Sequence, residues 1–596
     1  VMLRKNFYRL FEFIFKSVKE CSKFWFEYLF LFVGTTMGIV LVIIPLLEAI
    51  SGIIMRLSGI PYLSYNNLGD LIQHHFFGVI GLFLVLMLLI FLVAVQFIIQ
   101  FQGIRLIQLR TLTFKKLCSA VFSSIQRLNL QQLVFFFFYF LLILPFGRYV
   151  FSTPLLSKIK LPVFTLEFFL KRWQNIVMLL LFYAITFWMS SHLILTLPLL
   201  ILKGLPLKKA IKESVTRTKG VKNFIKISLY FGTIGLFSVI FQGMFFLFGY
   251  LIQRFMDQTS FALASATFLL DVIWIGSSIV STLSMVILFS FLIREAQVDD
   301  LKSFDMTGKS PRSRRKYKVI FLSSALILFA LVSWTYVEGF LDTIPKTISH
   351  RGVNDENGVQ NTIPALEATA KLKPDAVEID IQETKDLQFV VFHDPTLKDL
   401  AGINKRPQEL TLAQLKETVV SENGKRALIP SLDDYLSAAE KIHQKLLVEI
   451  KTSPLDSKNM VQNFSRKYGN RLLKDQDMIH SLSYPALVEE QKINPKIPVS
   501  FILPFNLLFP QTKMSAYTME ATTLDSHFVD QAHANHQKVF AWTVNEEDDM
   551  REQMFNGVDG IITDDLTGLK EVIAQDENHP SYAQRILKMA YIITSE

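Results

Sequence analysis

The chain has 596 residues, of which 51% are hydrophobic and 13% aromatic, with a formal net charge of +9. It is too long and too apolar for one water-soluble domain. Residues 1–340 hold 34 Lys and Arg against 14 Asp and Glu, whereas residues 341–596 hold 27 against 38. This asymmetry predicts a membrane half and a water-soluble half. Both cysteines, Cys21 and Cys118, lie in the first half, which excludes a disulfide framework from the second.

The first half, residues 1–340, is interpreted as a multi-pass α-helical membrane domain with about seven transmembrane helices. A helix that crosses a bilayer needs about 20 apolar residues. Apolar runs of suitable length lie at 24–50, 76–99, 133–151, 175–202, 226–252, 261–293 and 319–337. Run 261–293 contains Asp271 and is long enough to be one tilted helix or a broken pair. The first run lacks a small-residue cleavage site, so we expect an anchor and no cleavable signal peptide.

The short loops predict the orientation of this domain, because positive charge gathers on the cytoplasmic side. The N-terminus and segments 100–132, 203–226 and 294–318 are basic, and they alternate with loops that carry fewer basic residues. We therefore expect a cytoplasmic N-terminus in the cell membrane and an extracellular second half. The basic cluster before the last span is interpreted as a topology signal, so no nucleic-acid partner is expected. Segment 203–226 is either a helix on lipid headgroups or a solvated connecting helix.

Two ionisable residues inside apolar runs, His192 and Asp271, are candidates for function because charge is costly there. A packing or helix-pairing role is the favoured interpretation for both.

The second half, residues 341–596, has the length of an eight-stranded α/β barrel. Short β-branched runs alternate with helical stretches, which predicts a parallel TIM-like (β/α)8 barrel. Segment 521–526 is a further candidate, so the strand count stays open. Strands are expected at 347–350, 376–382, 389–393, 445–450, 478–482, 498–503, 538–544 and 559–563.

Charged residues stand where several of these strands end. Glu378 and Asp380 are two residues apart, so on a strand their side chains point to the same side. Two carboxylates so placed repel each other unless a cation lies between them. His350 and His393 are of the right type to transfer a proton near neutral pH. The pattern predicts a metal-assisted hydrolytic site at the carboxyl ends of the strands.

Eight short motifs follow one another along the second half. They are His350-Arg351-Gly352, Asn361-Thr362, Glu378-x-Asp380, His393-Asp394, Ile429-Pro430-Ser431-Leu432, Val448-Glu449-Ile450-Lys451, Trp542-Thr543-Val544-Asn545 and Gly560-Ile561-Ile562-Thr563-Asp564. Each motif is short, but their order and spacing together are specific. By these motifs, nearly all of residues 347–565 resembles the glycerophosphodiester phosphodiesterase family, and the first half resembles the membrane domain of some bacterial members.

The resemblance implies a role for each matching residue. His350 and His393 would be the acid and base, and Arg351 and Lys451 would bind the substrate phosphate. Three carboxylates would bind one divalent cation, Mg²⁺ or Ca²⁺, to which oxygen ligands are suited. These carboxylates are Glu378, Asp380 and Glu449.

Three further features bear on the site. The family usually has Glu where this chain has Gln360, which removes a negative charge near the expected metal. Trp542 is a candidate for substrate contact, with simple packing as the equal alternative. The remaining histidines of this half are expected to be surface or loop residues; they are His443, His480, His527, His533 and His536.

Three functions remain open from the sequence. The first is a membrane-anchored phosphodiesterase that releases an alcohol and sn-glycerol 3-phosphate from glycerophosphodiesters or glycerophosphate polymers. The second is a lyase that stops at a cyclic phosphate. The third is a non-catalytic binding barrel on a membrane domain that transports or senses. The lipid bilayer is an expected partner, and a homo-oligomer could form through the membrane domain.

Overall fold

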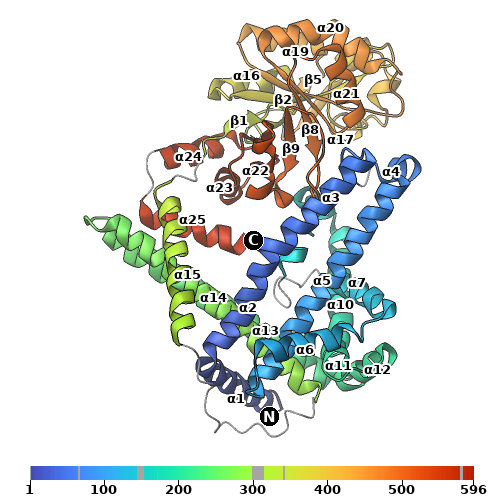
Figure 1. Cartoon of the computed structure of the whole chain (residues 1–596). Helices are drawn as coiled ribbons and strands as arrows, with labels where there is room; N and C mark the ends of the chain where they lie inside the picture. The colour runs from blue at the N-terminus through green and yellow to red at the C-terminus, as the bar shows by residue number, and fades with distance from the viewer. Residues whose placement is uncertain are drawn as a thin grey trace. The chain divides into compact units, whose positions relative to one another are not determined.

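The structure is a computed structural model that describes residues 2–64, 67–143, 153–160, 162–170, 172–297, 315–339, 343–577 and 581–595. The chain divides into two compact units (Figure 1). The first unit comprises Val1–Ile159, Phe164–Glu338 and Ser581–Glu596. The second comprises Lys160–Val163 and Gly339–Pro580. The C-terminal helix thus belongs, by its contacts, with the helices of the first half.

The first unit is built from helices alone among its described residues. Five of them, or joined pairs of them, are long and apolar enough to cross a bilayer: Trp25–Ser58, Phe76–Gln108, Trp173–Ile201, Val221–Met256 and Ala262–Glu295. The helices are α1 Met2–Lys23, α2 Trp25–Gly38, α3 Ile44–Ser58, α4 Leu68–His74, α5 Phe76–Gln108, α6 Phe114–Ile125, α7 Leu130–Ile143, α9 Val163–Leu170, α10 Trp173–Leu193, α11 Thr196–Ile201, α12 Leu207–Thr218, α13 Val221–Met256, α14 Ala262–Glu295, α15 Arg315–Val337 and α25 Tyr582–Ser595.

Two further segments bear on the number of spans. Helices α6 and α7 pass the test of length and apolarity together, but they meet at an angle of 99°. Residues 323–337 form a shorter apolar helix. The expected span 133–151 runs past residue 143, and most of the basic loop 294–318 lies outside the described residues. The count of seven therefore stays a prediction.

Helix α5 illustrates why these segments suit a bilayer. Its 33 residues contain Arg105 near the end and no acidic residue in the first turn. At 1.5 Å per residue it is about 50 Å long, which exceeds the roughly 30 Å hydrocarbon core. Its buried residues begin to dominate after Ile90, where aromatic side chains from neighbouring helices pack on it. Phe101 lies with its ring centroid 4.5 Å from that of Phe289 in α14.

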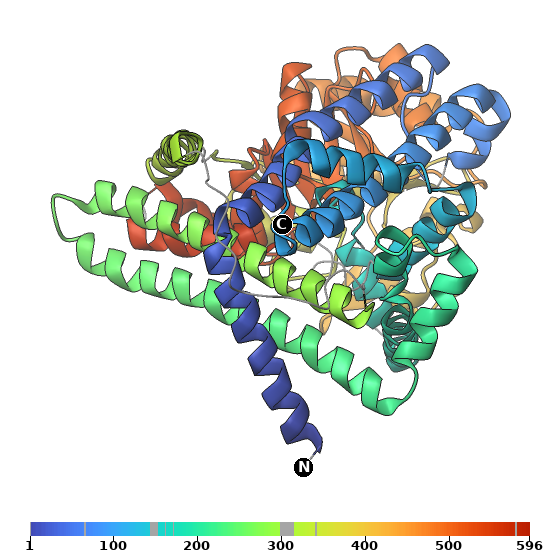
Figure 2. The same cartoon turned by 60° about the horizontal axis from the view of Figure 1, so that its bottom comes forward.

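Helices α13 and α14 form a long antiparallel pair whose two ends differ in chemistry (Figure 2). At one end, Lys226 and Glu295 form an ion pair at 2.6 Å. The guanidinium of Arg294 lies 4.1 Å from the ring centroid of Phe13 in α1. At the other end, Asp257 accepts a hydrogen bond of 3.0 Å from the backbone amide of Ala583 in α25. Basic segments therefore meet at one end, and the C-terminal helix docks at the other.

The two ionisable residues within the apolar runs both join helices. Asp271 in α14 accepts a 2.6 Å hydrogen bond from Ser333 in α15. The His192 ring in α10 lies 3.0 Å from the hydroxyl of Thr218 in α12. Each contact links two helices, as the helix-pairing interpretation expects.

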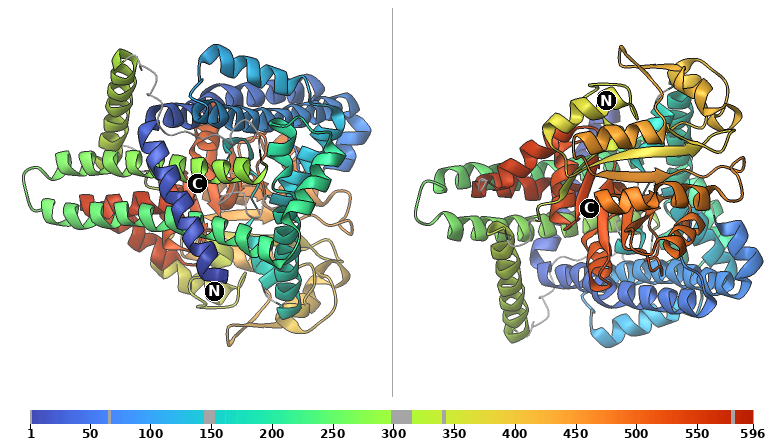
Figure 3. Two further views of the ribbon diagram at one scale, coloured as in Figure 1. Left: turned by 90° about the horizontal axis from the view of Figure 1, so that it is seen from below. Right: turned by 90° about the horizontal axis from the view of Figure 1, so that it is seen from above.

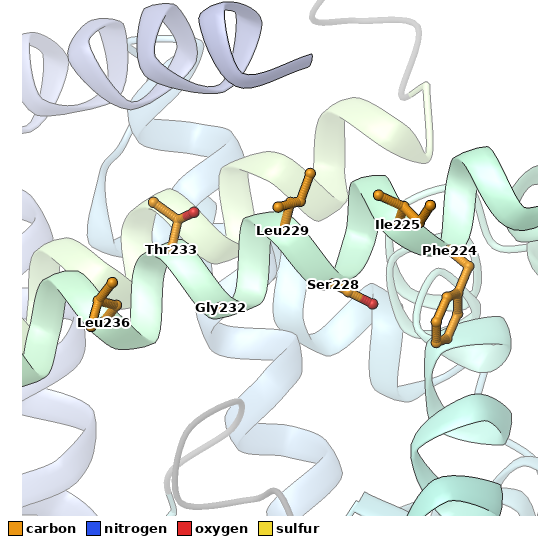
Figure 4. A pocket seen from close by; sticks show the side chains of 7 residues that line it. All are labelled: Phe224, Ile225, Ser228, Leu229, Gly232, Thr233 and Leu236. Atoms are coloured by element: carbon orange, nitrogen blue, oxygen red, sulfur yellow. The ribbon is translucent and has the colours of Figure 1, made fainter. Parts of the chain in front are cut away.

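A hollow of about 330 Å³ follows one face of α13, from Phe224 to Leu236 (Figure 4). Its described lining is apolar apart from the hydroxyls of Ser228 and Thr233. No titratable residue is among those that line it.

The second unit is a closed barrel of eight parallel strands, because β1 pairs with both β2 and β11. Its strands and the helices between them can be followed from yellow to red in Figure 3. The strands are β1 Lys346–Ser349, β2 Ala376–Glu383, β6 Leu446–Ile450, β7 Met478–Ser481, β8 Val499–Leu503, β9 Ala516–Glu520, β10 Lys538–Trp542 and β11 Gly560–Thr563. The α-helices are α16 Ile363–Thr369, α17 Lys398–Ala401, α18 Leu412–Lys416, α19 Leu432–Lys441, α20 Met460–Asp475, α21 Tyr484–Ile493, α22 Ser526–Ala534, α23 Glu547–Phe555 and α24 Leu566–Glu577.

The parallel barrel is confirmed, but one predicted strand lies outside the eight barrel strands, and one barrel strand was not predicted. The segment expected at 389–393 forms β3 Phe389–Val391, which pairs antiparallel with β2 and is not one of the eight. The missing barrel strand is β9, whereas residues 521–523 form a 3₁₀ turn. The short turn between β2 and β3 allows only an antiparallel return, since a parallel strand needs a long crossover. Strand β9 lacks a Val or Ile run, so its sequence gave a weak signal.

A short hairpin, β4 Val419–Glu422 and β5 Lys425–Leu428, stands apart from the barrel sheet. It becomes important at the site because Glu422 ends its first strand.

Inside the barrel, a layer of apolar side chains lies nearer the amino-terminal ends of the strands, and a layer of polar side chains lies nearer their carboxyl ends. Ile348, Leu447, Phe540 and Ile562 belong to one buried cluster. The polar layer includes Asp380 on β2, Glu449 on β6 and His480 on β7, which are neighbours in the strand register. The apolar layer closes the barrel interior and leaves the polar layer near the carboxyl ends, where such barrels carry their chemistry.

One buried carboxyl makes a prediction about stability. Asp477 precedes β7, is 2% exposed, and accepts a 2.7 Å hydrogen bond from the Leu446 amide. Burial raises the pKa of this carboxyl from 3.8 to about 7. Between these values the folded state holds a proton that the unfolded state releases, so stability falls as pH rises through this window.

Asp477→Asn keeps the acceptor oxygen and removes the ionisation. We expect the thermal midpoint of the barrel to fall less between pH 5 and pH 8 in this variant than in the unmodified protein. The exposed Asp530→Asn is the matched control and should retain the original slope. Equal slopes for Asp477→Asn and the unmodified protein would contradict the prediction.

Candidate active site

The turn after β1 positions the first group of site residues. Residues His350–Gly352 form a 3₁₀ turn in which Arg351 has a left-handed backbone, with φ of 52°. The amide of Arg351 donates a 2.8 Å hydrogen bond to Glu378 Oε2. A Cβ atom at Gly352 would come within 2.8 Å of the Tyr435 hydroxyl. Glycine therefore lets this turn approach α19 and hold Arg351 over the end of β2.

Each predicted acid–base histidine is held by a carboxylate through Nδ1. The distance is 2.8 Å from His350 to Asp564 and 2.8 Å from His393 to Asp394. Burial alone would raise the pKa of Asp564, but His350, Asn545 and Arg351 lower it to about 2. The pKa of Asp394 is likewise lowered, because His393 and Arg351 outweigh burial. Both carboxylates therefore accept the Nδ1 proton and leave Nε2 as the reactive nitrogen.

Arg351 connects His393 with the residue at the unusual position 360. Its Nη2 lies 2.8 Å from His393 Nε2, and its Nη1 donates a 2.6 Å hydrogen bond to Gln360 Oε1. A guanidinium can only donate, so Nε2 must carry a lone pair. His393 Nε2 is therefore the acceptor of this contact with Arg351.

Three carboxylates and one ammonium group lie buried between β2 and β6. Lys451 Nζ contacts Asp380 Oδ1 at 3.0 Å and Glu449 Oε1 at 2.9 Å. Burial acts to raise the pKa of Asp380, but Lys451, His393, Arg351 and a hydrogen bond from Asn361 hold it well below its usual value. At Glu449 burial prevails over Lys451, and its pKa is raised.

Lys451 thus contacts two of the three expected metal ligands. Its own pKa is raised by these carboxylates, against the effect of burial. Loss of one partner from such a buried pair costs about 3–5 kcal/mol, because the other charge is left uncompensated. Lys451 therefore balances the buried negative charge of Asp380 and Glu449, independently of any contact with a substrate.

The expectation that His480 is a surface or loop residue was wrong. It lies on β7, is 2% exposed, and has Nε2 3.4 Å from Glu378 Oε1. Glu378, Glu449 and His480 offer ligand atoms that all lie within 4.8 Å of one another, and all three are buried. The sequence held one signal for this position. His480 lies within the short strand Met478-Ile479-His480-Ser481, which has no other charged residue, so its side chain could have been expected to point into the barrel.

Gln360 is paired with a carboxylate from the separate hairpin. Its side-chain amide donates a 2.7 Å hydrogen bond to Glu422 Oε1, and its backbone amide donates one of 2.9 Å to Glu422 Oε2. Glu422 therefore supplies a negative charge beside Gln360, where a Glu at position 360 would have carried one itself. The Gln360 side chain separates this charge from Arg351. No motif in the sequence indicated this role for Glu422.

The remaining site residues include one that was predicted and several that were not. Trp542 is half-buried at the end of β10, and its indole donates a 3.1 Å hydrogen bond to the Thr518 carbonyl. Substrate contact by Trp542 stays a prediction. Asp394, Asn545 and Asp564 occur in the motifs, but their role in holding the histidines follows from the structure. Asn545 donates a 3.0 Å hydrogen bond to Asp564 Oδ2.

A family model for the "membrane domain of glycerophosphoryl diester phosphodiesterase" matches residues 14–333, more than half of the chain. The chain belongs to this family. A second model, for the glycerophosphoryl diester phosphodiesterase family, matches residues 350–567 of this phosphodiesterase. The enzyme is therefore a phosphoric diester hydrolase that joins the family's membrane domain to its catalytic barrel.

Curated relatives match the barrel of the phosphodiesterase. A glycerophosphodiester phosphodiesterase from Caldanaerobacter subterraneus is 26% identical over 227 residues, which are 37% of this chain and 93% of that one. A lysophospholipase D from Homo sapiens is 24% identical over 272 residues, 39% of this chain and 86% of that one. A solved Oleispira antarctica phosphodiesterase in complex with the product sn-glycerol-3-phosphate is 20% identical, with a TM-score of 0.36, over 40% of this chain and 99% of that one.

The pairing of Gln360 with Glu422 makes the second prediction. Gln360→Glu would place two carboxylates at hydrogen-bond distance in a partly buried position, where like charges repel. We expect this variant of the phosphodiesterase to lose activity, although it restores the residue usual in the family. Glu422→Gln in the same chain should recover the loss, since one carboxylate and one amide then face each other again.

The measurement is kcat/KM for glycerophosphocholine in a double-mutant cycle of the two positions. We expect a coupling of about 0.5–3 kcal/mol, the range seen for contacting residues. Additive effects, or higher activity in Gln360→Glu alone, would contradict the pairing.

Proposed function

We propose that this phosphodiesterase is membrane-anchored and metal-dependent, and that it hydrolyses glycerophosphodiesters to an alcohol and sn-glycerol 3-phosphate. His350 and His393 are the acid–base pair. The observation that carries this proposal is the matched arrangement of the two histidines, each with Nδ1 on a carboxylate. Such pairs fix the tautomer that leaves Nε2 free for proton transfer.

The donor set fits a divalent cation. Glu378 and Glu449 are buried carboxylates beside His480, whose ring nitrogens lack a hydrogen-bond partner among the described residues. Glu378, Glu449 and Asp380 are the residues we propose to hold the ion, Mg²⁺ or Ca²⁺ in the family pattern. When bound, such an ion offsets charge on the phosphoryl oxygens as a Lewis acid.

The protein's own groups supply the remaining chemistry. Arg351 has a planar fork that matches two phosphate oxygens. In the free enzyme it donates to His393, so phosphate binding to Arg351 would release His393 Nε2. His393 then removes the proton from the attacking hydroxyl, and His350 protonates the leaving alcohol. Lys451 is a second candidate phosphate contact from its place beside Asp380.

A lyase reaction uses the same groups with a different nucleophile. If the neighbouring glycerol hydroxyl attacks, His393 still accepts its proton and His350 still protonates the leaving group, and a cyclic phosphate forms. Release of this product is the alternative outcome in the assay below. A non-catalytic barrel is disfavoured, because both histidines and their carboxylates are in place.

The substrates proposed are soluble glycerophosphodiesters and glycerophosphate polymers. The names of the curated relatives, glycerophosphodiester phosphodiesterase and lysophospholipase D, support a glycerol-linked phosphodiester. Trp542 is the proposed contact for the substrate at the rim of the barrel.

We propose residues 1–340 as the membrane domain and residues 341–596 as the catalytic part, with the N-terminus cytoplasmic and the barrel extracellular. Support comes from the first unit, in which Lys226, Arg294 and the basic α12 lie at one end of the α13–α14 pair. The end of α15 lies at the opposite end, because Tyr336 and Arg585 exchange hydrogen bonds beside Asp257. Positive charge marks the cytoplasmic side. A homo-oligomer through the membrane domain stays a prediction.

The orientation predicts which residues a membrane-impermeant maleimide can reach in intact cells. In a chain with Cys21 and Cys118 changed to Ser, we expect Lys538→Cys on the barrel to be labelled and Lys209→Cys on α12 to be labelled only after permeabilisation. Both lysines are exposed in the structure, so a difference in labelling would report the side of the membrane and not burial of the side chain. Labelling in the reverse pattern would place the barrel in the cytoplasm.

If the proposed activity is correct, the full chain in detergent should release sn-glycerol 3-phosphate from glycerophosphocholine in a metal-dependent reaction. His350→Ala and His393→Ala should each lower kcat by about 10²–10⁴-fold, the usual contribution of general acid–base catalysis. The exposed His443→Ala should leave kcat unchanged.

EDTA should abolish turnover, and added Mg²⁺ or Ca²⁺ should restore it. Turnover that resists EDTA would contradict the metal dependence. A lasting cyclic phosphate would favour the lyase reaction.

A further inference from the structure

We propose that His480 is a direct ligand of the divalent cation in this phosphodiesterase. His480 would then take the position proposed above for Asp380, so that Glu378, Glu449 and an imidazole hold the ion. This donor set favours a transition-metal ion over the Mg²⁺ or Ca²⁺ of the family pattern. The inference rests on the proposed metal dependence and adds the chemical class of the ion.

The position of His480 in the barrel is the first support. In the strand register, Asp380 on β2 pairs with Glu449 on β6, and Glu449 pairs with His480 on β7. Register partners on neighbouring parallel strands point to the same face, which here is the barrel interior. His480 therefore stands in the same row as two of the expected ligands.

The unsatisfied state of the imidazole is the second support. The His480 side chain is buried, and neither Nδ1 nor Nε2 has a hydrogen-bond partner among the residues that the structure describes. Its Nε2 lies 3.4 Å from Glu378 Oε1. A buried polar ring without a partner costs free energy, so a residue of this kind marks the place of a missing ligand.

The contacts of Asp380 are the third support. Its Oδ1 accepts from Lys451 at 3.0 Å, and its Oδ2 accepts from Asn361 at 2.7 Å. Both oxygens are therefore engaged by the protein. Glu378, Glu449 and His480 are the three residues whose ligand atoms come together, within 4.8 Å of one another.

The donor chemistry then selects the class of ion. Mg²⁺ and Ca²⁺ prefer oxygen ligands, whereas imidazole nitrogen suits transition-metal ions such as Zn²⁺ and Fe²⁺. Charge agrees with a divalent ion. Glu378, Asp380 and Glu449 carry three negative charges when ionised, against two positive charges on Arg351 and Lys451. A divalent ion would leave one net positive charge for the single negative charge of a phosphodiester.

Mn²⁺ is the probe for the test, because its electron spin reports a coordinated nitrogen. The full chain in detergent is loaded with one equivalent of Mn²⁺, and electron spin echo envelope modulation is recorded for ¹⁴N coupling. We expect an imidazole coupling in the unmodified protein, its loss in His480→Gln, and its retention in His443→Gln, which changes an exposed histidine of the same barrel.

Binding titrations of Mn²⁺ and Ca²⁺ to the same three proteins give a second readout. We expect His480→Gln to lose Mn²⁺ affinity by about 10-fold or more, a scale that even residues behind the ligands reach. Ca²⁺ affinity should change less, so the Mn²⁺ preference of the site falls.

Absence of nitrogen coupling in the unmodified protein would overturn the inference without any variant. If hydrolysis is still abolished by EDTA in that case, the proposed metal-dependent function stands and only the role of His480 fails. A His480→Gln protein with unchanged Mn²⁺ affinity and unchanged coupling would also overturn it. If neither ion binds and turnover resists EDTA, the metal dependence itself fails.

Discussion

The burial of three carboxylates on two adjacent strands is the constraint on which the site depends. Glu378, Asp380 and Glu449 are each at most 8% exposed. Such groups persist in a low-dielectric interior only when cations and hydrogen-bond donors surround them. Lys451 and Arg351 lie against Asp380 for this reason, and their combined charge still falls one short. This excess of carboxylates over cationic side chains is the observation behind the proposed metal dependence.

Arg351 links this charge balance to proton transfer. The left-handed backbone at Arg351 directs its amide to Glu378, while its guanidinium reaches His393 and Gln360. The same residue thus contacts both a carboxylate of the buried cluster and one of the two proposed acid–base histidines. Glu422 completes this arrangement from a hairpin outside the barrel sheet. A residue that differs from the family pattern is therefore accommodated by a second residue that offsets it.

In the membrane half, a cluster of charged side chains lies at one end of the α13–α14 pair. Lys226, Glu295 and Arg294 meet at one end of the α13–α14 pair. The C-terminal helix α25 packs at the other end, where Ile586 contacts Phe246 and Ile273. This helix follows the barrel in sequence but groups, by its contacts, with the helical unit.

Sequence alone determined the parts that depend on local pattern. Long apolar runs predicted the helices, and β/α alternation predicted the parallel barrel. Charged residues at strand ends indicated His350, Glu378, Asp380 and His393 as candidates, and the family resemblance added Arg351, Glu449 and Lys451. Tertiary structure decided the rest, because it depends on which strands become neighbours. Register brought His480 beside Glu449, closure of the barrel placed Asp564 on His350, and the hairpin carried Glu422 to Gln360. The same reason explains the two strand errors: β3 has the composition of a barrel strand, but its short turn returns it antiparallel, while β9 owes its place to pairing with β8 and β10.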